Sequence, residues 1–307
     1  MALACRAGLL GLAALAGCGE NRSAAGELLP IERLAFVPEG RRALLGGSYW
    51  LGADEALLVG RYEVTRAEWR AWAEEAGAPL PPSPDFGDWA PEDDRLPAAG
   101  MDYTEAVAFA AAQGMRLPAV EEWAWCVSGP RGLSYPYGNV AAGSGSNTLE
   151  VGLGEPMPPG TFPVGRAAGG ISDLFGNMEE WGSWTGQTAW VPSRSEHHGS
   201  DGLAAWALGG SWRDPSRRLF KLGKNPNLIG RELEPGYRSQ SVGLRMVTEA
   251  RGYLEREAAG LSKREWRERM VAVGASWGSP AVGLLDELSS AAGSPEALQW
   301  LLEGARQ

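Results

Sequence analysis

Two groups of polar side chains in the middle of this chain have residue types suited to metal or anion chemistry. In the segment 196–201, Glu196, His197, His198 and Asp201 could form a small metal site, because imidazole and carboxylate groups suit zinc or iron. Adjacent residues of an extended segment point to opposite sides, however, so His197 and His198 are poorly placed to share one ion. The alternative is a solvated loop, and we favour the loop.

Arg213, Arg217 and Arg218 form a basic cluster in a chain whose formal net charge is −10. A guanidinium group can receive a carboxylate or sulfate of a ligand through two parallel hydrogen bonds. Internal ion pairs are the alternative use of these arginines. Trp190 and Trp206 lie in the segment 185–207, which is expected to be a loop. The candidate ligand contacts are therefore these two tryptophans, the two histidines and the three arginines.

The elements that must position these residues are short. Thr65 with Glu68, and Asp102 with Glu105, are spaced as capping boxes, which predicts helices beginning at both places. From 129 to 248 the chain has little helical periodicity and many Gly, Ser and Pro residues, which predicts short strands and long loops. Loops held on a rigid scaffold are where such a domain binds ligands.

The last part of the chain has a different, helical character. Ser262 and Glu265 are spaced as a further capping box, and Ser-Pro pairs at 279–280 and 294–295 predict two more helix starts. Apolar residues recur at helical spacing from 266 to 277 and include two tryptophans. We interpret this stripe as core that docks on the main domain, in preference to a ligand site.

The N-terminus has the pattern of a secretory signal peptide. Residues 1–18 carry one positive charge, at Arg6, and then an apolar run over 9–16 that is too short to span a bilayer. The run ends in a Leu-Ala-Gly-Cys sequence similar to a bacterial lipobox, which predicts a lipid on Cys18 and a membrane anchor of several acyl chains. An ordinary signal peptide is the alternative. The expected location is the bacterial cell envelope, at the outer membrane rather than the inner, facing the periplasm or the surface.

Cysteine usage and charge narrow the function classes. If Cys5 is removed and Cys18 acylated, the mature protein keeps only Cys126, which excludes a disulfide framework. Cys126 lies on a predicted helix and is expected to be a small buried hydrophobe rather than a reactive thiol. A sequence pI near 4.9 argues against nucleic acid as a partner, because phosphates require a basic surface.

Eight segments, in order along the chain, resemble the sulfatase-modifying-factor family, to which the formylglycine-generating enzymes belong. They are FVPEGRRALLGGSYWLG at 36–52, RYEVTRAEWRAW at 61–72, the stretch 96–129, YPYGN at 135–139, TFPVG at 161–165, ISDLFGNMEEW at 171–181, LGGSW at 208–212 and SVGLRMV at 241–247. The resemblance implies an α+β fold, a formylglycine-generating-enzyme-like variant of the C-type-lectin-like fold, loop-rich with short strands and few helices, here followed by a C-terminal helical appendix.

The resemblance implies a family domain at 35–248 and a calcium site. The patterns outside it predict a signal peptide at 1–18, a tether at 19–34 and a helical extension at 249–307. In the family a structural Ca²⁺ is held by a side-chain oxygen, two carbonyls and a glutamate, which correspond to Asp173, the carbonyl oxygens of Gly176 and Met178, and Glu180. A second family calcium site corresponds to Asn147 and the Thr148 carbonyl, but its downstream Asp is missing and we expect this site to be absent.

The family's reactive groups are not present. In the enzymes two cysteines just past the GGSW-like segment bind copper(I); the corresponding residues here are Asp214 and Leu219, which cannot hold copper(I). Another branch of the family forms ergothioneine-type C–S bonds on non-haem iron, using three histidines of an additional helical domain. The sequence therefore favours a lipid-anchored, non-catalytic module that binds a protein, peptide or glycan of the envelope. The alternative is an enzyme of the formylglycine-generating or non-haem-iron superfamily that acts through a different metal centre.

Overall fold

Short strands form the centre of the molecule. The computed structural model describes residues 30–44, 49–81, 89–140, 145–184, 204–216 and 230–307. Within these ranges, a three-stranded antiparallel sheet has the order β1-β4-β9 (Leu34–Val37, Leu57–Gly60, Val247–Glu249), and β2 pairs with β3 as a hairpin (Gly40–Leu44, Tyr49–Ala53). A four-stranded sheet has the order β7-β6-β5-β8 (Gly230–Leu233, Ala204–Leu208, Glu179–Trp184, Val242–Leu244), in which β5 and β8 are parallel.

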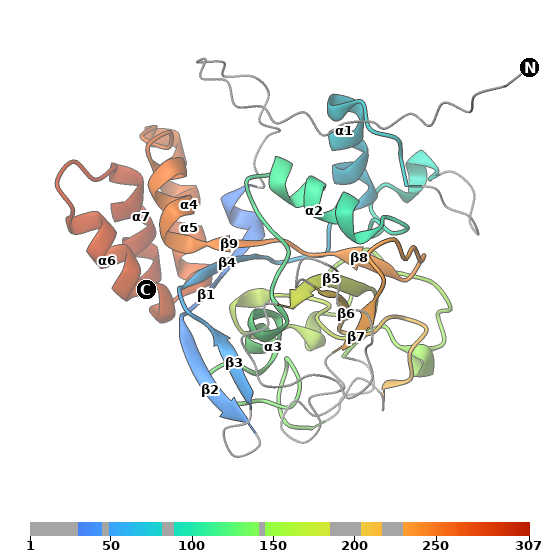
Figure 1. Ribbon diagram of the computed structural model, residues 1–307. Coiled ribbons are helices and arrows are strands. Elements are labelled where there is room, and N and C mark those ends of the chain that lie inside the picture. The colour runs from blue at the N-terminus through green and yellow to red at the C-terminus, as the bar shows by residue number, and fades with distance from the viewer. Residues whose placement is uncertain (1–29, 45–48, 82–88, 141–144, 185–203, 217–229) are drawn as a thin grey trace, which may run out of the picture.

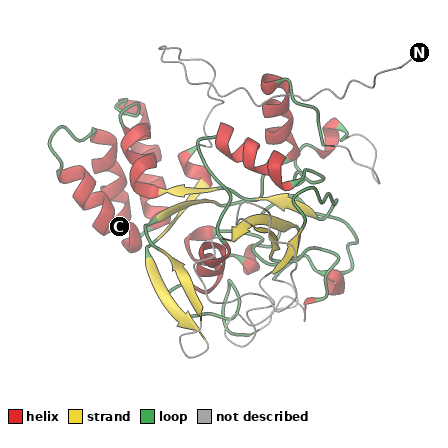
Figure 2. Ribbon diagram, viewed as in Figure 1, coloured by secondary structure: helices red, strands yellow, loops and turns green. Residues whose placement is uncertain are grey.

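Helices lie around these sheets, as Figure 2 shows by colour. In Figure 1, α1 and α2 lie above the strands and α3 lies near the β2-β3 hairpin, whereas the last four helices gather on the opposite side from β7. The helices are α1 Arg66–Ala76, α2 Tyr103–Ala112, α3 Val120–Ser128, α4 Ala250–Ala258, α5 Arg267–Trp277, α6 Val282–Ser290 and α7 Glu296–Ala305. Helices and strands together confirm the expected α+β class.

The first two helices begin where their capping boxes predict. The backbone N–H of Thr65 donates to Glu68 Oε2 at 2.8 Å, and Glu68 N donates back to Thr65 Oγ1 at 3.4 Å. Asp102 and Glu105 make the same reciprocal pair, with both hydrogen bonds at 3.0 Å. Because both boxes satisfy amides that the helix itself leaves unbonded, they fix the starts of α1 and α2.

The cap expected at Ser262 is wrong. A 3-10 turn over Arg264–Trp266 comes first, in which Trp266 N donates to Lys263 O at 3.0 Å, and α5 begins only at Arg267. This turn delays the α-helical backbone by about one turn, which puts the helix start beyond the reach of the Ser262 side chain.

The two helices expected at the Ser-Pro pairs are confirmed as α6 and α7, but neither serine caps its helix. A 3-10 turn over Ser279–Ala281 precedes α6, and α7 begins directly after Pro295. Neither helix has a side-chain hydrogen bond at its cap residue.

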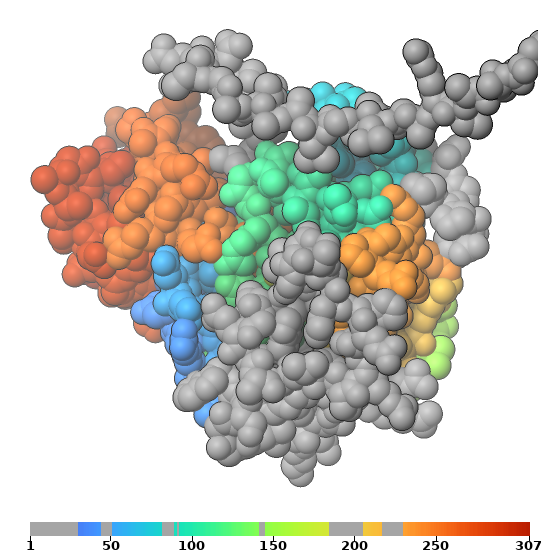
Figure 3. Space-filling model, viewed as in Figure 1, coloured from blue at the N-terminus to red at the C-terminus, as the bar shows by residue number. Residues whose placement is uncertain are grey.

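The C-terminal helices share the core of the domain. The indole N–H of Trp277 donates to the Leu34 carbonyl at 2.9 Å, and its ring lies 5.9 Å from that of Phe36, so α5 is joined to β1. Met270 and Val273, on the same helix, are buried in the same hydrophobic cluster. The interpretation of this stripe as docked core is therefore confirmed, and Figure 3 shows these helices as a lobe continuous with the rest of the molecule.

Helices α5 and α7 approach each other through glycines. A Cβ added at Gly274 would lie 2.1 Å from the Leu301 carbonyl oxygen, and one added at Gly304 would lie 2.1 Å from that of Val271. Only glycine allows two helix backbones to come this close. None of the helices in the described ranges is both long enough and apolar enough to cross a membrane.

Candidate functional site

The loop that leads into β5 has an unusual backbone. Asp173 and Asn177 have φ angles of 58° and 61°, and they are the non-glycine residues with positive φ in the described part of the chain. Such conformations are uncommon outside glycine and cluster at functional sites. Both residues are almost fully buried. The loop 173–178 is thus a candidate site on backbone grounds alone.

At the end of this loop, Glu180 is fully engaged by other side chains. Its carboxylate accepts hydrogen bonds from Arg245 Nε and from an Arg245 terminal nitrogen at 3.0 and 2.5 Å. The indole N–H of Trp123 donates to its Oε2 at 2.9 Å. A metal ion that used Glu180 would have to share this carboxylate with a guanidinium group.

A residue that the sequence analysis did not select, Glu63, holds the middle of the loop. Its Oε1 accepts the backbone N–H of Met178 at 3.0 Å, and its Oε2 accepts the side-chain amide of Asn177 at 2.7 Å. Glu63 lies just after β4 and is fully buried, 114 residues away from Asn177 in the chain. Nothing in the local sequence pattern indicates this contact, since glutamates are mostly exposed.

These residues leave an excess of negative charge in the core. Glu63, Asp173 and Glu180 are all buried, and Arg245 is the buried cation among them. With every group ionised, three negative charges and one positive leave two negative charges unbalanced. Burial, followed by the charges of Asp173 and Glu180, raises the pKa of Glu63 well above its usual value. Burial likewise raises the pKa of Asp173.

Asn147 contacts the same loop and has an unsatisfied oxygen. Its Nδ2 donates to the Glu155 carbonyl at 2.9 Å and to Asn177 Oδ1 at 3.0 Å, which fixes the orientation of the amide. Its Oδ1 is buried and has no hydrogen-bond partner. The Thr148 carbonyl accepts a hydrogen bond from Val151 N at 3.0 Å. An orphaned amide oxygen of this kind suits a hard cation or a water molecule.

The loop therefore fits a calcium ion in charge and in donor type. The two unbalanced negative charges equal the charge of Ca²⁺, and the loop offers a carboxylate at Asp173 and carbonyl oxygens at Gly176 and Met178. In the described ranges, no three His, Cys, Asp or Glu side chains lie close enough to hold a metal by themselves. Such an ion would be held by Asp173 and the two carbonyl oxygens, and it would share Glu180 with Arg245.

At the first of the two positions where the resemblance places cysteines, Asp214 has a structural role. Its Oδ2 accepts the backbone N–H and the hydroxyl of Ser211 at 2.9 and 2.8 Å, and its carbonyl accepts Leu149 N at 3.0 Å. The carboxylate thus closes the turn that follows β6. The nearby backbone N–H of Ser216 donates to Glu150 Oε2 at 2.7 Å.

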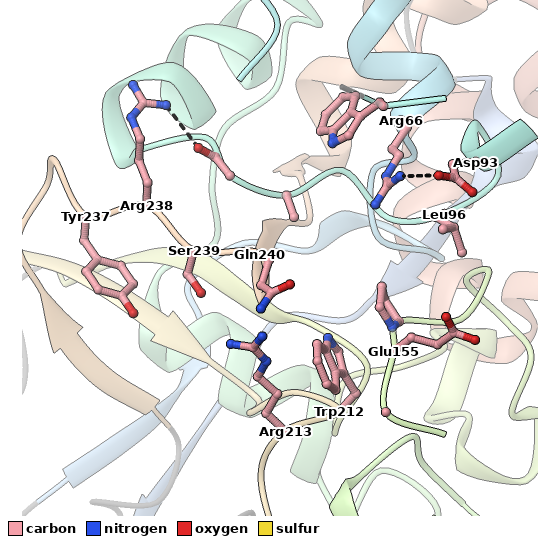
Figure 4. A pocket seen from close by; sticks show the side chains of 15 residues that line it. Arg66, Asp93, Leu96, Glu155, Trp212, Arg213, Tyr237, Arg238, Ser239 and Gln240 are labelled. Carbon is pink, nitrogen blue, oxygen red and sulfur yellow. Dashed lines mark hydrogen bonds and ion pairs between the residues drawn. The ribbon is translucent and has the colours of Figure 1, made fainter. Parts of the chain in front are cut away.

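Beside this turn lies a pocket of about 540 Å³, shown in Figure 4. It is formed where the segment after β6, the loop before β8 and the start of α1 meet. Its walls are polar and aromatic, and carry three arginines: Arg66, Arg213 and Arg238. The pocket joins the segments 89–100, 154–156, 212–213 and 237–240.

Two of the expected ligand contacts can be placed. Arg213 lines the pocket, as a ligand contact should. Trp206, in contrast, is wrong as a ligand contact. It lies in β6, which is paired on both sides, and its side chain is only 3% exposed in the hydrophobic core.

Several sequence-based candidates lie outside the described residues. They are Cys18, Trp190, Glu196, His197, His198, Asp201, Arg217, Arg218 and Leu219. Cys126 is described and is a free, buried thiol whose pKa is raised to about 12, first by burial, as expected for a structural cysteine.

Comparison with known proteins identifies the class. Residues 51–250 match the family described as the sulfatase-modifying factor enzyme 1-like domain, and the chain belongs to this family. Solved structures share the fold: PvdO from Pseudomonas aeruginosa has a TM-score of 0.52 at 19% identity, and CarF a TM-score of 0.51 at 18% identity. Each covers 70% of this chain, and the match covers 94% and 97% of their own lengths.

Curated relatives include enzymes and a protein named as inactive. The hercynine oxygenase of Mycolicibacterium thermoresistibile is 30% identical over 228 residues, which are 60% of this chain and 50% of that protein. The inactive C-alpha-formylglycine-generating enzyme 2 of Mus musculus is 32% identical over 105 residues, 31% of this chain and 34% of that protein. The chain thus spans half or less of the length of these relatives.

Proposed function

We propose that this chain is a non-catalytic binding module of the sulfatase-modifying-factor family that recognises a protein, peptide or glycan at the bacterial cell envelope. The observation that carries the proposal is the role of Asp214. Where the resemblance places the first catalytic cysteine, this carboxylate is bonded to Ser211 and closes a turn. A carboxylate cannot replace a thiolate as a copper(I) ligand or as a partner in thiol exchange.

The pocket beside Asp214 supports a role in ligand binding for a domain that lacks the family's cysteine chemistry. Its volume lies in the range of small-molecule and peptide pockets, and its walls combine aromatic rings with hydrogen-bonding groups. The similarity to an inactive formylglycine-generating-enzyme relative is consistent with a family fold that has kept its pocket without its chemistry.

The proposal also includes a lipid anchor on Cys18 and a structural calcium ion. A lipid on Cys18 would tether the domain to the membrane, at the outer membrane rather than the inner. Calcium is the expected structural ion, and copper is not expected. When bound, Ca²⁺ would neutralise the buried carboxylates and fix the loop, with Asp173, the Gly176 and Met178 carbonyls and Glu180 as its expected ligands. If a second calcium ion binds, its ligands would by the same chemistry include Asn147 and the Thr148 carbonyl.

An enzyme with a different metal centre is the second candidate, and the similarity to hercynine oxygenases favours it. The chain has only two histidines, adjacent at 197 and 198, so it would need a metal site assembled from Glu196, Asp201 and these two side chains. We place it second because adjacent side chains rarely bind one ion together.

A direct assay separates the two candidates. The purified full chain is supplied with copper(I), oxygen and a cysteine-containing peptide, and in parallel with iron(II), oxygen, hercynine and a thiol. We expect no product and no oxygen consumption above the protein-free control in either reaction. Turnover that is lost in His197→Ala or His198→Ala would establish the enzyme instead.

A further inference from the structure

The arginines of the pocket are not equivalent, and the difference indicates what the pocket binds. This inference rests on the proposed function, because it names the ligand chemistry of the same pocket. Arg238 is fully bonded: its two terminal nitrogens donate to the Gly100 carbonyl, Asp102 and Glu105 at distances of 2.6 to 3.1 Å. Because its charge is already matched by Asp102 and Glu105, Arg238 forms a fixed wall of the pocket and offers a ligand no net positive charge.

Arg66 is also neutralised. Its guanidinium donates to Asp93 Oδ2 at 3.1 Å and lies 5.4 Å from the ring centre of Trp89. Figure 4 shows this pair at the upper side of the pocket. Since its charge is matched by Asp93, Arg66 offers a ligand little net charge.

Arg213 differs from both. It lies over the ring of Trp212, with its guanidinium carbon 4.6 Å from the ring centre, and it forms no ion pair with any carboxylate of the described residues. Its partner is instead a neutral group: with the Gln240 amide turned so that its oxygen faces the guanidinium, an Arg213 terminal nitrogen donates to that oxygen at 2.9 Å. Its backbone N–H donates to Ser211 Oγ at 3.3 Å, within the turn that Asp214 closes. Stacking on an indole and a fixed backbone both hold the guanidinium in place before a ligand arrives.

The charge around Arg213 favours a ligand group with a single negative charge. Glu155 also lines the pocket, but its carboxylate points away from Arg213 in Figure 4. A dianion such as a phosphate ester would find one cation without a carboxylate partner, whereas a carboxylate finds a single bidentate partner. The side chain of Ser239 lines the same wall and can hydrogen-bond neutral polar groups of the ligand.

We propose that Arg213 anchors a carboxylate-binding subsite, in which a ligand carboxylate replaces the neutral Gln240 amide as the bidentate partner of the guanidinium while the rest of the ligand lies along Trp212 and Ser239. The volume of about 540 Å³ suits a ligand the size of two or three amino acids or sugar units. The carboxylate can be the C-terminus of a peptide chain or the acid group of a sugar acid.

Calorimetric titration of the purified full chain tests this subsite. The probes are acetyl-trialanine as the free acid, the same peptide as its C-terminal amide, and glucuronate. We expect the free acid or glucuronate to bind, and the peptide amide to bind at least about tenfold more weakly than the acid, because it lacks the charge that pairs with Arg213. A response to the peptide acid alone assigns a chain terminus, and a response to glucuronate alone assigns a sugar acid.

Two variants connect the binding to the residue. Arg213→Gln should weaken the preferred acid about tenfold or more, while Arg95→Gln, which removes an exposed arginine that does not line the pocket, should leave it unchanged. Measurable binding of peptide acid and amide with equal affinity, no binding of either acid by the unmodified chain, or unchanged binding of the preferred acid in Arg213→Gln would overturn the subsite. Enzymatic turnover would refute the proposed function without bearing on this comparison of acid and amide.

Discussion

Arg245 and Glu180 form an ion pair in the interior of the domain, with side chains that are 0% and 1% exposed. Arg245 also donates to the carbonyl oxygens of Gly60 and Ser172 at 2.8 and 2.7 Å. The pair thus joins four parts of the chain: β4, the loop before β5, β5 itself and the segment after β8. A buried ion pair of this kind fixes one arrangement of loops, because either charge alone is costly to bury.

Breaking this pair should destabilise the fold severely. Arg245→Met leaves Glu180 buried without its cation, and we expect the free energy of unfolding to fall by about 3–5 kcal/mol. Urea denaturation followed by circular dichroism measures the change. The exposed pair of Arg41 and Asp54 provides the control, since Arg41→Ala should cost less than about 1 kcal/mol. A loss at Arg245 no greater than at Arg41 would contradict the role given to the pair.

The buried carboxylates predict how metal-free stability depends on pH. The pKa of Glu63 is raised in the folded state, so its contribution to stability is full below the unfolded pKa, near 4.5, and is lost as pH rises through the folded pKa. The free energy of unfolding in the presence of a chelator should therefore fall as pH rises above about 4.5. Glu63→Gln should flatten this slope, and the exposed Glu75→Gln should not. An identical slope in both variants would show that Glu63 does not titrate as described.

The close approach of α5 and α7 predicts that an added methyl group between them destabilises the protein, whereas a methyl group on an open helix position does not. Gly274→Ala places a methyl group against the Leu301 carbonyl and should destabilise the protein by about 1–3 kcal/mol. Gly283→Ala, in α6 with nothing within 4 Å of the added Cβ, should stabilise it by up to about 1 kcal/mol through helix propensity. Thermal unfolding of both variants measures the difference. Equal effects would mean that the two helices do not pack as described.

The lipobox-like sequence predicts a covalent lipid. Cys18→Ala should abolish incorporation of a labelled fatty acid and release the chain from the membrane fraction of a bacterial host. Cys5→Ala, within the segment expected to be removed, should change neither result. A labelled product in the Cys18 variant would contradict lipidation at Cys18, and an unlabelled unmodified chain would leave an ordinary signal peptide as the interpretation of residues 1–18.

Features encoded within a few residues could be predicted from the sequence. Thr65 and Glu68 are three positions apart, and their reciprocal hydrogen bonds need no other part of the fold. Asp173 and Glu180 were found through a family motif, and both are buried in one loop and its following strand.

Features that depend on distant partners could not be predicted in this way. Glu63 reaches Asn177 only because the fold brings the end of β4 beside the loop, and an isolated glutamate carries no local signal of burial. Trp206 was assigned to a loop because the segment 129–248 is rich in Gly, Ser and Pro, whereas pairing of β6 with β5 and β7 buries it. Likewise, the pairing of Arg213 with a neutral amide rather than a carboxylate of the described residues depends on which side chains the fold places around it.

Elemental analysis of the purified full chain tests the central claim that this family member binds without redox chemistry. The account predicts about one calcium per chain and no stoichiometric copper or iron, since the copper positions are Asp214 and Leu219. Stoichiometric copper, iron or zinc would contradict the non-catalytic module and make the segment 196–201 the first target for substitution.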